Sequence, residues 1–180
     1  MSDEVVIRHC APTLASIKTG SLFTSRFETQ EAMRESLRRL NRRIRGKGLR
    51  AIPLRYREGV GLIYLYRPQR LSADLLDEHA ARLLTEMGYM AAHPEECLRR
   101  LASRLAETNE FPHEIGLFLS YPPEDVDGFM NRHGDVKYVG AWKVYGDVQA
   151  AQRTFDRYRS CTRSCLRRWQ QGWSIEQLAV

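Results

Sequence analysis

The sequence lacks any long uncharged apolar run, and it is poor in cysteine and lysine. Its 180 residues hold 4 cysteines and 4 lysines beside 24 arginines. Without an apolar run of about 20 residues, we expect no membrane-spanning helix and no membrane partner. The first residues, Met1 to Glu4, lack the basic region and apolar stretch of a secretory signal. These absences predict a cytoplasmic protein.

Familiar site motifs are absent as well. The chain has no P-loop, no Gly-x-Gly-x-x-Gly, no His-Glu-x-x-His and no zinc-finger spacing. The cofactor therefore stays unknown, and no metal site is predicted. The cysteines show no framework spacing, so reduced thiols are expected. Cys161 and Cys165 lie one helical turn apart and offer two metal ligands, but small residues on a packed helix face are the favoured interpretation.

What is present indicates a globular protein. The hydrophobic fraction is 43% and the charged fraction 28%, which suits one domain over residues 1–180 with a hydrophobic core. The net charge of +6 is unevenly spread, because residues 26–57 and 153–168 are rich in arginine while residues 107–135 are acidic. This asymmetry indicates a basic face that meets nucleic acid, an acidic protein or a phosphorylated ligand. A bias in genomic base composition is the alternative explanation for so much arginine.

Periodicity and turn residues predict the elements. We expect strands over residues 5–9, 49–56, 60–66, 115–119 and 138–145. We expect helices over residues 28–47, 72–87 and 94–107, a short one from residue 122, a long one from residue 148 and a last turn at 174–177. Met33, Leu37, Leu40 and Ile44 form the clearest apolar stripe. Together these elements predict a single α/β domain with a central sheet of about five strands flanked by about five helices, and a mixed α+β arrangement is the alternative.

Several segments also resemble one bacterial family. They are His9-Cys-Ala-Pro-Thr13, Lys18-x-Gly-x-Leu-Phe23, Leu62-Ile-Tyr-Leu-Tyr-Arg-Pro68, Phe111-Pro-His-Glu-Ile-Gly-Leu-Phe-Leu-Ser-Tyr-Pro-Pro-Glu-Asp-Val126 and Trp142-Lys-Val-Tyr145. The sequence resembles the domain-of-unknown-function family 3793, seen chiefly in anaerobes, over nearly its whole length. This resemblance implies a stand-alone cytosolic protein and supplies no activity, cofactor or catalytic residue. An association with genes for flavodoxin and iron handling slightly favours a redox or metal-related role.

The segment around Cys10 is the first candidate site. A thiol at a strand end, just before a helical turn at Pro12, would feel the helix dipole, which favours the thiolate. His9 or Lys18 could stabilise that thiolate or relay protons. The competing interpretation is a buried cysteine beside a histidine that hydrogen-bonds to the backbone.

Two further candidate groups follow later in the chain. His113 and Glu114, at the start of the expected strand 115–119, could serve as acid and base or as metal ligands. They would lie at the opposite end of that strand from Pro122, so one site could not use both ends. Lys143 and Tyr145 share one side of the expected strand 138–145 and could hold a phosphate or carboxylate. The alternatives are a histidine bonded to a neighbouring carbonyl and a lysine stem that covers apolar surface.

These observations support two main hypotheses. The first is a small enzyme or redox- or metal-related accessory protein, with a site around Cys10, His9 and Lys18 that His113 or Lys143 joins. In that hypothesis the arginine-rich helix docks an acidic partner such as flavodoxin. The second is a non-catalytic binding module that docks RNA or an acidic protein through Arg34, Arg38, Arg42 and Arg45, or contacts nucleic acid nonspecifically. A structural subunit that needs a partner is a third option.

Overall fold

A computed structural model describes residues 1–107, 111–132 and 134–180. By internal contacts the chain divides into two compact units, unit 1 (Met1–Gln69 and Ser160–Val180) and unit 2 (Arg70–Arg159). The prediction of a single domain over residues 1–180 stays a prediction, because such a division does not say whether either unit folds alone.

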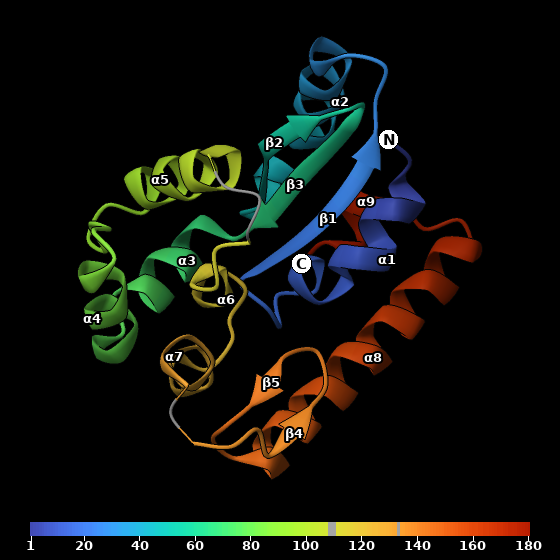
Figure 1. The fold of residues 1–180 in the computed structure, drawn as a ribbon. Coiled ribbons are helices and arrows are strands. Elements are labelled where there is room, and N and C mark those ends of the chain that lie inside the picture. Colours follow the sequence, from blue (N-terminus) through green and yellow to red (C-terminus); the bar gives the residue numbers. More distant parts are fainter. Residues whose placement is uncertain (108–110, 133) are drawn as a thin grey trace. The chain divides into compact units, whose positions relative to one another are not determined.

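Unit 1 is built on a three-stranded antiparallel sheet of order β1-β3-β2 (Figure 1). Its strands are β1 (Gly20–Arg26), β2 (Arg50–Arg57) and β3 (Val60–Tyr66). Phe23 of β1 and Pro53 of β2 both pair with Ile63 of β3, and a bulge shifts the β2 register after Pro53. The β2–β3 pair confirms the predicted hairpin, whereas β1 was not predicted from the sequence.

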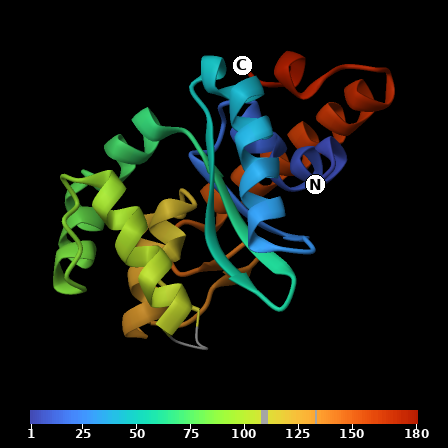
Figure 2. The same ribbon diagram turned by 90° about the horizontal axis from the view of Figure 1, so that it is seen from above.

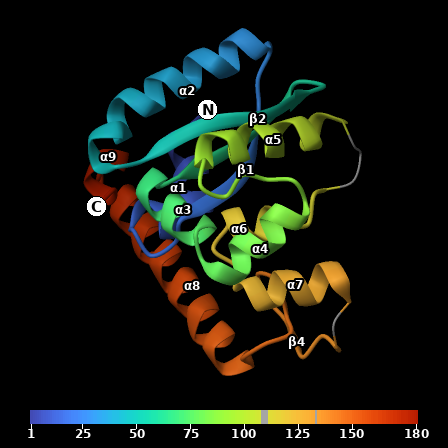
Figure 3. The same ribbon diagram turned by 90° about the vertical axis from the view of Figure 1, so that its left-hand side faces the viewer.

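The helices of unit 1 are α1 (Asp3–Leu14), α2 (Gln30–Ile44), the 3-10 turn η1 (Arg45–Lys47), the second half of α8 (Val148–Gln170) and α9 (Ile175–Leu178). Apolar residues of α1, α2 and α9 form one core with the sheet face that carries Phe23, Ile63 and Leu65. Figures 2 and 3 show α2 lying along the sheet. Its predicted stripe is confirmed, because Met33, Leu37, Leu40 and Ile44 are all buried.

The expected strand over residues 5–9 is wrong, because these residues lie in α1. Ser2 caps the helix by accepting a hydrogen bond from the Val5 N–H, and Asp3 and Glu4 occupy its first turn. The buried positions Val6, Ile7, Cys10, Ala11 and Leu14 follow the helical period. Pro12 does not end α1 but is accommodated inside its last turn.

Polar contacts tie the parts of unit 1 together. The buried Arg67 guanidinium donates to the backbone oxygens of Thr13, Leu14 and Lys47 at 2.8, 2.7 and 3.1 Å, and also to that of Val180. Thr13 and Leu14 end α1, Lys47 ends η1 and Val180 follows α9. One side chain therefore provides hydrogen bonds to backbone oxygens that would otherwise be costly to bury.

Unit 2 is mainly helical and carries a two-stranded sheet. Its elements are most of α3 (Pro68–Leu75), then α4 (Glu78–Glu86), α5 (Pro94–Glu107), α6 (Ile115–Phe118), α7 (Pro123–Asn131), β4 (Tyr138–Val139), β5 (Lys143–Val144) and the first half of α8 (Val148–Gln170). Trp142, Val144, Ala151 and Phe155 form a small core between the β4–β5 pair and α8. The predicted helices from residues 94, 122 and 148 are confirmed.

The central five-stranded sheet is wrong. The described strands form two separate sheets, of three and two strands, so the fold is mixed α+β. Residues 115–119, expected as a strand, contain the single-turn helix α6. Residues 138–145, expected as one strand, turn back at Gly140 to form β4 and β5. The expected helix 72–87 is two helices, because Asp77 caps α4 with hydrogen bonds from the His79 and Ala80 N–H groups. None of the described helices has the length and apolarity needed to cross a membrane.

Candidate functional site

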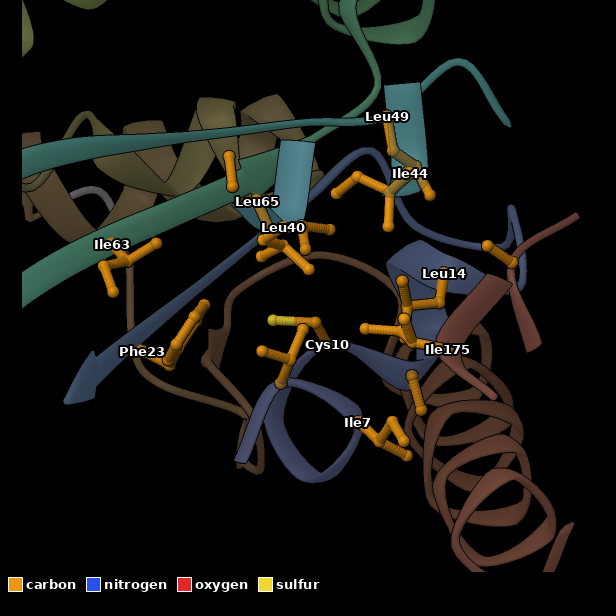
Figure 4. Packing of buried hydrophobic residues seen from close by; sticks show 14 of the residues in the cluster. Ile7, Cys10, Leu14, Phe23, Leu40, Ile44, Leu49, Ile63, Leu65 and Ile175 are labelled. Atoms are coloured by element: carbon orange, nitrogen blue, oxygen red, sulfur yellow. The ribbon is translucent and has the colours of Figure 1, made fainter. Parts of the chain in front are cut away.

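Cys10 lies inside the core of unit 1 (Figure 4). It is 0% exposed, and Phe23, Leu40 and Leu65 belong to the same cluster. Burial raises the pKa of the Cys10 thiol well above its usual value, although the Lys18 charge and a hydrogen bond with Ser21 act in the opposite direction. Cys10 is therefore a protonated thiol at neutral pH, which is a poor nucleophile.

The structure brings Lys18 close to Cys10 but leaves His9 on the surface. Lys18 follows α1, and its backbone N–H donates to Pro12 O at 3.1 Å. Burial lowers the pKa of Lys18 to about 8, and the neighbouring Cys10 partly opposes that shift. His9 is exposed, and its ring stacks on Phe23 with centroids 6.2 Å apart. Of the predicted group His9, Cys10 and Lys18, the structure therefore brings only Cys10 and Lys18 together.

A pocket of about 220 Å³ lies within unit 2, between α6, α7 and the loop before β5. Four of its eleven lining residues are aromatic: Phe111, Tyr121, Phe129 and Trp142. His113 and Lys143 line it too, so two residues predicted separately from the sequence meet at one cavity. Most of the surface is apolar, with a few polar groups, which is the usual character of a small-molecule site.

Ring contacts fix the walls of this pocket. Trp142 and Tyr121 stack with centroids 4.7 Å apart. His113 meets Phe129 edge-on at 4.7 Å, and Lys143 Nζ lies 4.9 Å from the centroid of the same Phe129 ring. Both polar residues are therefore held beside one aromatic wall while remaining exposed to solvent.

Asp125 fixes the position of the segment that carries Trp142 and Lys143. Its buried carboxylate accepts hydrogen bonds from Trp142 Nε1 at 2.7 Å and from the Tyr145 and Gly146 N–H groups at 2.7 and 2.8 Å. These three donors come from the segment that carries Lys143. Asp125 thus connects α7 to β5 and orients the Trp142 ring.

Glu114 anchors the chain segment that carries His113. It is 0% exposed, and its Oε1 accepts a hydrogen bond from Tyr89 Oη at 2.7 Å and forms an ion pair with Arg104 Nε at 3.1 Å. Burial, and then the hydrogen bond to Glu114, raises the pKa of Tyr89. Its Oε2 has no hydrogen-bond partner within the described part of the chain. Because Glu114 follows His113 directly, this anchor sets the position of the His113 backbone.

The close approach of α6 to α7 depends on Gly116. A Cβ at this position would lie 2.8 Å from Val126 Cγ2 and 2.9 Å from Tyr121 Cδ2. Both neighbours line the pocket, so a larger residue would push the pocket walls apart.

The prediction that one site cannot use both ends of segment 113–122 is wrong. A strand would separate these ends at about 3.3 Å per residue. The α6 turn instead rises only about 1.5 Å per residue, so His113 and Tyr121 line the same pocket. Tyr145 does not line it, because its ring packs beside Gly128. Sequence reasoning missed Phe111, Tyr121, Phe129 and Asp125, and the signal was the density of aromatic residues between 111 and 142.

Other chemistry in the described chain is limited. Among residues 1–107, 111–132 and 134–180, no group of three or more His, Cys, Asp or Glu side chains could hold a metal ion. Cys161 and Cys165 lie one turn apart on α8, as predicted. Their mutual hydrogen bond raises the pKa of the Cys161 thiol and lowers that of Cys165.

The fold and pocket define a small mixed α+β protein with a buried cysteine and an aromatic cavity that carries one histidine and one lysine. The chain belongs to the family described as protein of unknown function (DUF3793), whose model matches residues 6–179. This match confirms the resemblance stated from the sequence motifs. Neither the curated proteins nor the solved structures contain a match to this chain.

Proposed function

We propose that unit 2 binds a small planar organic anion. The observation that carries this proposal is that His113 and Lys143 line the same aromatic pocket. In this arrangement the ring of the ligand lies among Phe111, Phe129 and Trp142, and its negative charge meets the Lys143 ammonium at the mouth of the pocket.

The size of the pocket limits the ligand to one or two rings. Its volume of about 220 Å³ exceeds the roughly 150 Å³ of a cavity that admits benzene. It is below the lower end, about 300 Å³, of pockets that hold drug-sized molecules. A benzoate-, nicotinate- or indole-carboxylate-sized molecule therefore fits best.

The charges at the pocket favour an anion. Lys143 and His113 both supply N–H donors, and the Lys143 ammonium group carries three of them. Asp125 also lines the pocket, but its two oxygens already accept three hydrogen bonds, which offset its negative charge. If the site also catalyses a reaction, His113 is the residue able to accept or donate a proton.

The hypothesis of a site centred on Cys10 receives less support. Its thiol is buried and protonated, so neither thiolate attack nor a redox exchange is accessible without opening the core of unit 1. We therefore keep the enzymatic hypothesis only for the His113–Lys143 pocket.

Calorimetric titration tests the proposal with benzoate, nicotinate and indole-3-carboxylate, each compared with its neutral carboxamide. We expect the best carboxylate to bind about tenfold more tightly than its amide, which corresponds to about 1.4 kcal/mol. The Lys143→Met variant keeps the stem over Phe129 but removes the charge, so it should abolish this preference.

The matched control is Lys137→Met, since Lys137 is exposed on the same hairpin but does not line the pocket. This control should keep the preference for the carboxylate. Equal binding of acid and amide by the native protein, or no binding by any of the six compounds, would overturn the proposal.

A further inference from the structure

The helix α2 carries a row of arginines on the side opposite to its buried stripe. Arg34, Arg38 and Arg42 follow at intervals of four residues, and Arg45 continues the row in η1. Residues four apart in a helix lie on one face. All four side chains are exposed, and we call them the arginine face. Figure 2 shows α2 and its junction with η1 in unit 1.

Little negative charge offsets the arginine face. Glu35 is shared, with its carboxylate oxygens 3.6 Å from Arg38, 3.6 Å from Arg39 and 3.9 Å from Arg42. The Arg38 and Arg42 side chains are 71% and 70% exposed. Exposed ion pairs at such distances contribute little free energy. A phosphate group can therefore replace Glu35 as the partner of these arginines.

The length of the row suits a line of phosphates. From Arg34 to Arg45 the backbone rises roughly 17 Å at about 1.5 Å per residue. A strand of duplex DNA carries one phosphate per about 3.4 Å of helix axis, so the row is as long as about five consecutive phosphates. Guanidinium groups donate two parallel hydrogen bonds to phosphate oxygens.

The chemistry around the row favours nucleic acid over an acidic protein. Protein interfaces depend on buried aromatic or aliphatic anchors, and single-stranded nucleic acid is held by stacking on aromatic rings. Among the described residues, the exposed large hydrophobic side chains are Leu76, Met90, Phe111, Val136, Tyr138, Val139, Trp173 and Val180. None of them belongs to α2. The face offers charge and hydrogen bonds alone, which is what contact with a duplex backbone requires.

We propose that the arginine face docks on the phosphate backbone of double-stranded nucleic acid, without reading its bases. This site lies in unit 1 and shares no residue with the pocket of unit 2. Duplex DNA and duplex RNA offer the same phosphodiester chemistry, and the experiment below includes both.

The test is fluorescence anisotropy of the full chain with labelled duplexes of mixed sequence, one of DNA and one of RNA, at several salt concentrations. Four phosphate contacts predict a slope of log K against log salt of about −3 to −4. The double variant Arg38→Gln/Arg42→Gln should reduce the magnitude of that slope by about 2 and weaken binding to every sequence alike. Gln keeps a helix propensity similar to that of Arg, and circular dichroism confirms the fold of each variant.

A second double variant, Arg99→Gln/Arg159→Gln, changes the net charge equally at exposed arginines outside α2. The proposal requires that this control keep the native slope. It fails if the control weakens binding as much as the α2 variant, because net charge would then explain the affinity. It also fails if neither duplex binds at low salt, or if poly-glutamate displaces the duplex at equal charge, which would assign the face to an acidic protein.

Discussion

At the scale of single residues, burial decides which candidate groups can react. Cys10 and His9 are neighbours in sequence, yet one is 0% exposed and the other lies on the surface. Lys18 is close enough to act on the Cys10 thiol electrostatically, but desolvation is the largest influence on both groups. A charged neighbour does not activate a thiol that burial keeps protonated.

Cys10 should therefore be inert in the folded protein. We expect a thiol reagent at about pH 8 to react with the Cys161–Cys165 pair, in which the pKa of Cys165 is lowered to about 7, but to label Cys10 only after unfolding. The Cys10→Ala variant should lower the free energy of unfolding by about 1–3 kcal/mol, because it leaves a gap in the core. Peptide mass spectrometry locates the label. Labelling of Cys10 as fast as the Cys161–Cys165 pair under native conditions would contradict this prediction.

At the scale of elements, a few side chains join helices that are distant in sequence. Arg43 of α2 donates to Asp3 of α1 at 2.7 and 2.8 Å and to Glu176 of α9 at 2.5 and 3.1 Å. Each side chain is about a third exposed. The hydrogen bonds from Arg43 lower the pKa of Glu176 to about 2, from an ordinary value of 4.5.

This network should stabilise unit 1 in a pH-dependent way. A carboxyl group whose pKa is lower in the folded protein stabilises it above its unfolded pKa, and that contribution is lost as the pH falls from about 4.5 toward 2. Arg43→Gln should therefore cost about 1 kcal/mol at neutral pH, since the network is partly exposed, and less at about pH 3.

Urea denaturation of both proteins at the two pH values measures the difference. Arg39→Gln is the matched control, because Arg39 lies on the same helix and pairs at 3.6 Å with Glu35, whose side chain is 46% exposed. Its cost should stay within about 0.5 kcal/mol at either pH. If the loss of free energy of unfolding in Arg43→Gln does not change with pH, the carboxylate pairs contribute nothing to stability.

At the scale of the whole molecule, the two proposed activities belong to different units. The pocket is formed by residues 111–143 of unit 2, and the arginine face by residues 34–45 of unit 1. Because the two sites share no residue, we expect mutations in them to have nearly additive effects.

The two activities should therefore separate by mutation. Lys143→Met should leave the salt slope of duplex binding unchanged, while Arg38→Gln/Arg42→Gln should leave carboxylate affinity within about twofold. Calorimetry and anisotropy on the same four protein preparations (native, each variant and the combined variant) decide this. Loss of both activities in either single-site variant would mean that the sites are coupled or that the fold is damaged.

Amphipathic patterns were the most informative part of the sequence. The stripe of α2 predicted its helix and its exposed arginines together, and the glycine-bearing turn at Gly59 predicted the β2–β3 hairpin. Short apolar segments were misleading, because four or five apolar residues fit a buried strand and a buried helical turn equally well. Residues 115–119 are of this kind, and the apolar run at residues 5–7 is shorter still; the structure places residues 5–7 and 115–118 in helices.

The sequence by itself determined the long helices, the hairpin and the charge of α2, since each depends on residues that are neighbours along the chain. Only the tertiary structure decided the fate of Cys10 and the meeting of His113 with Lys143. Burial of a thiol depends on contacts from α2 and the sheet, and the pocket depends on a one-turn helix that shortens segment 113–122. Such long-range contacts leave no periodic signal in the sequence, because the residues that make them are far apart along the chain and become neighbours only when it folds.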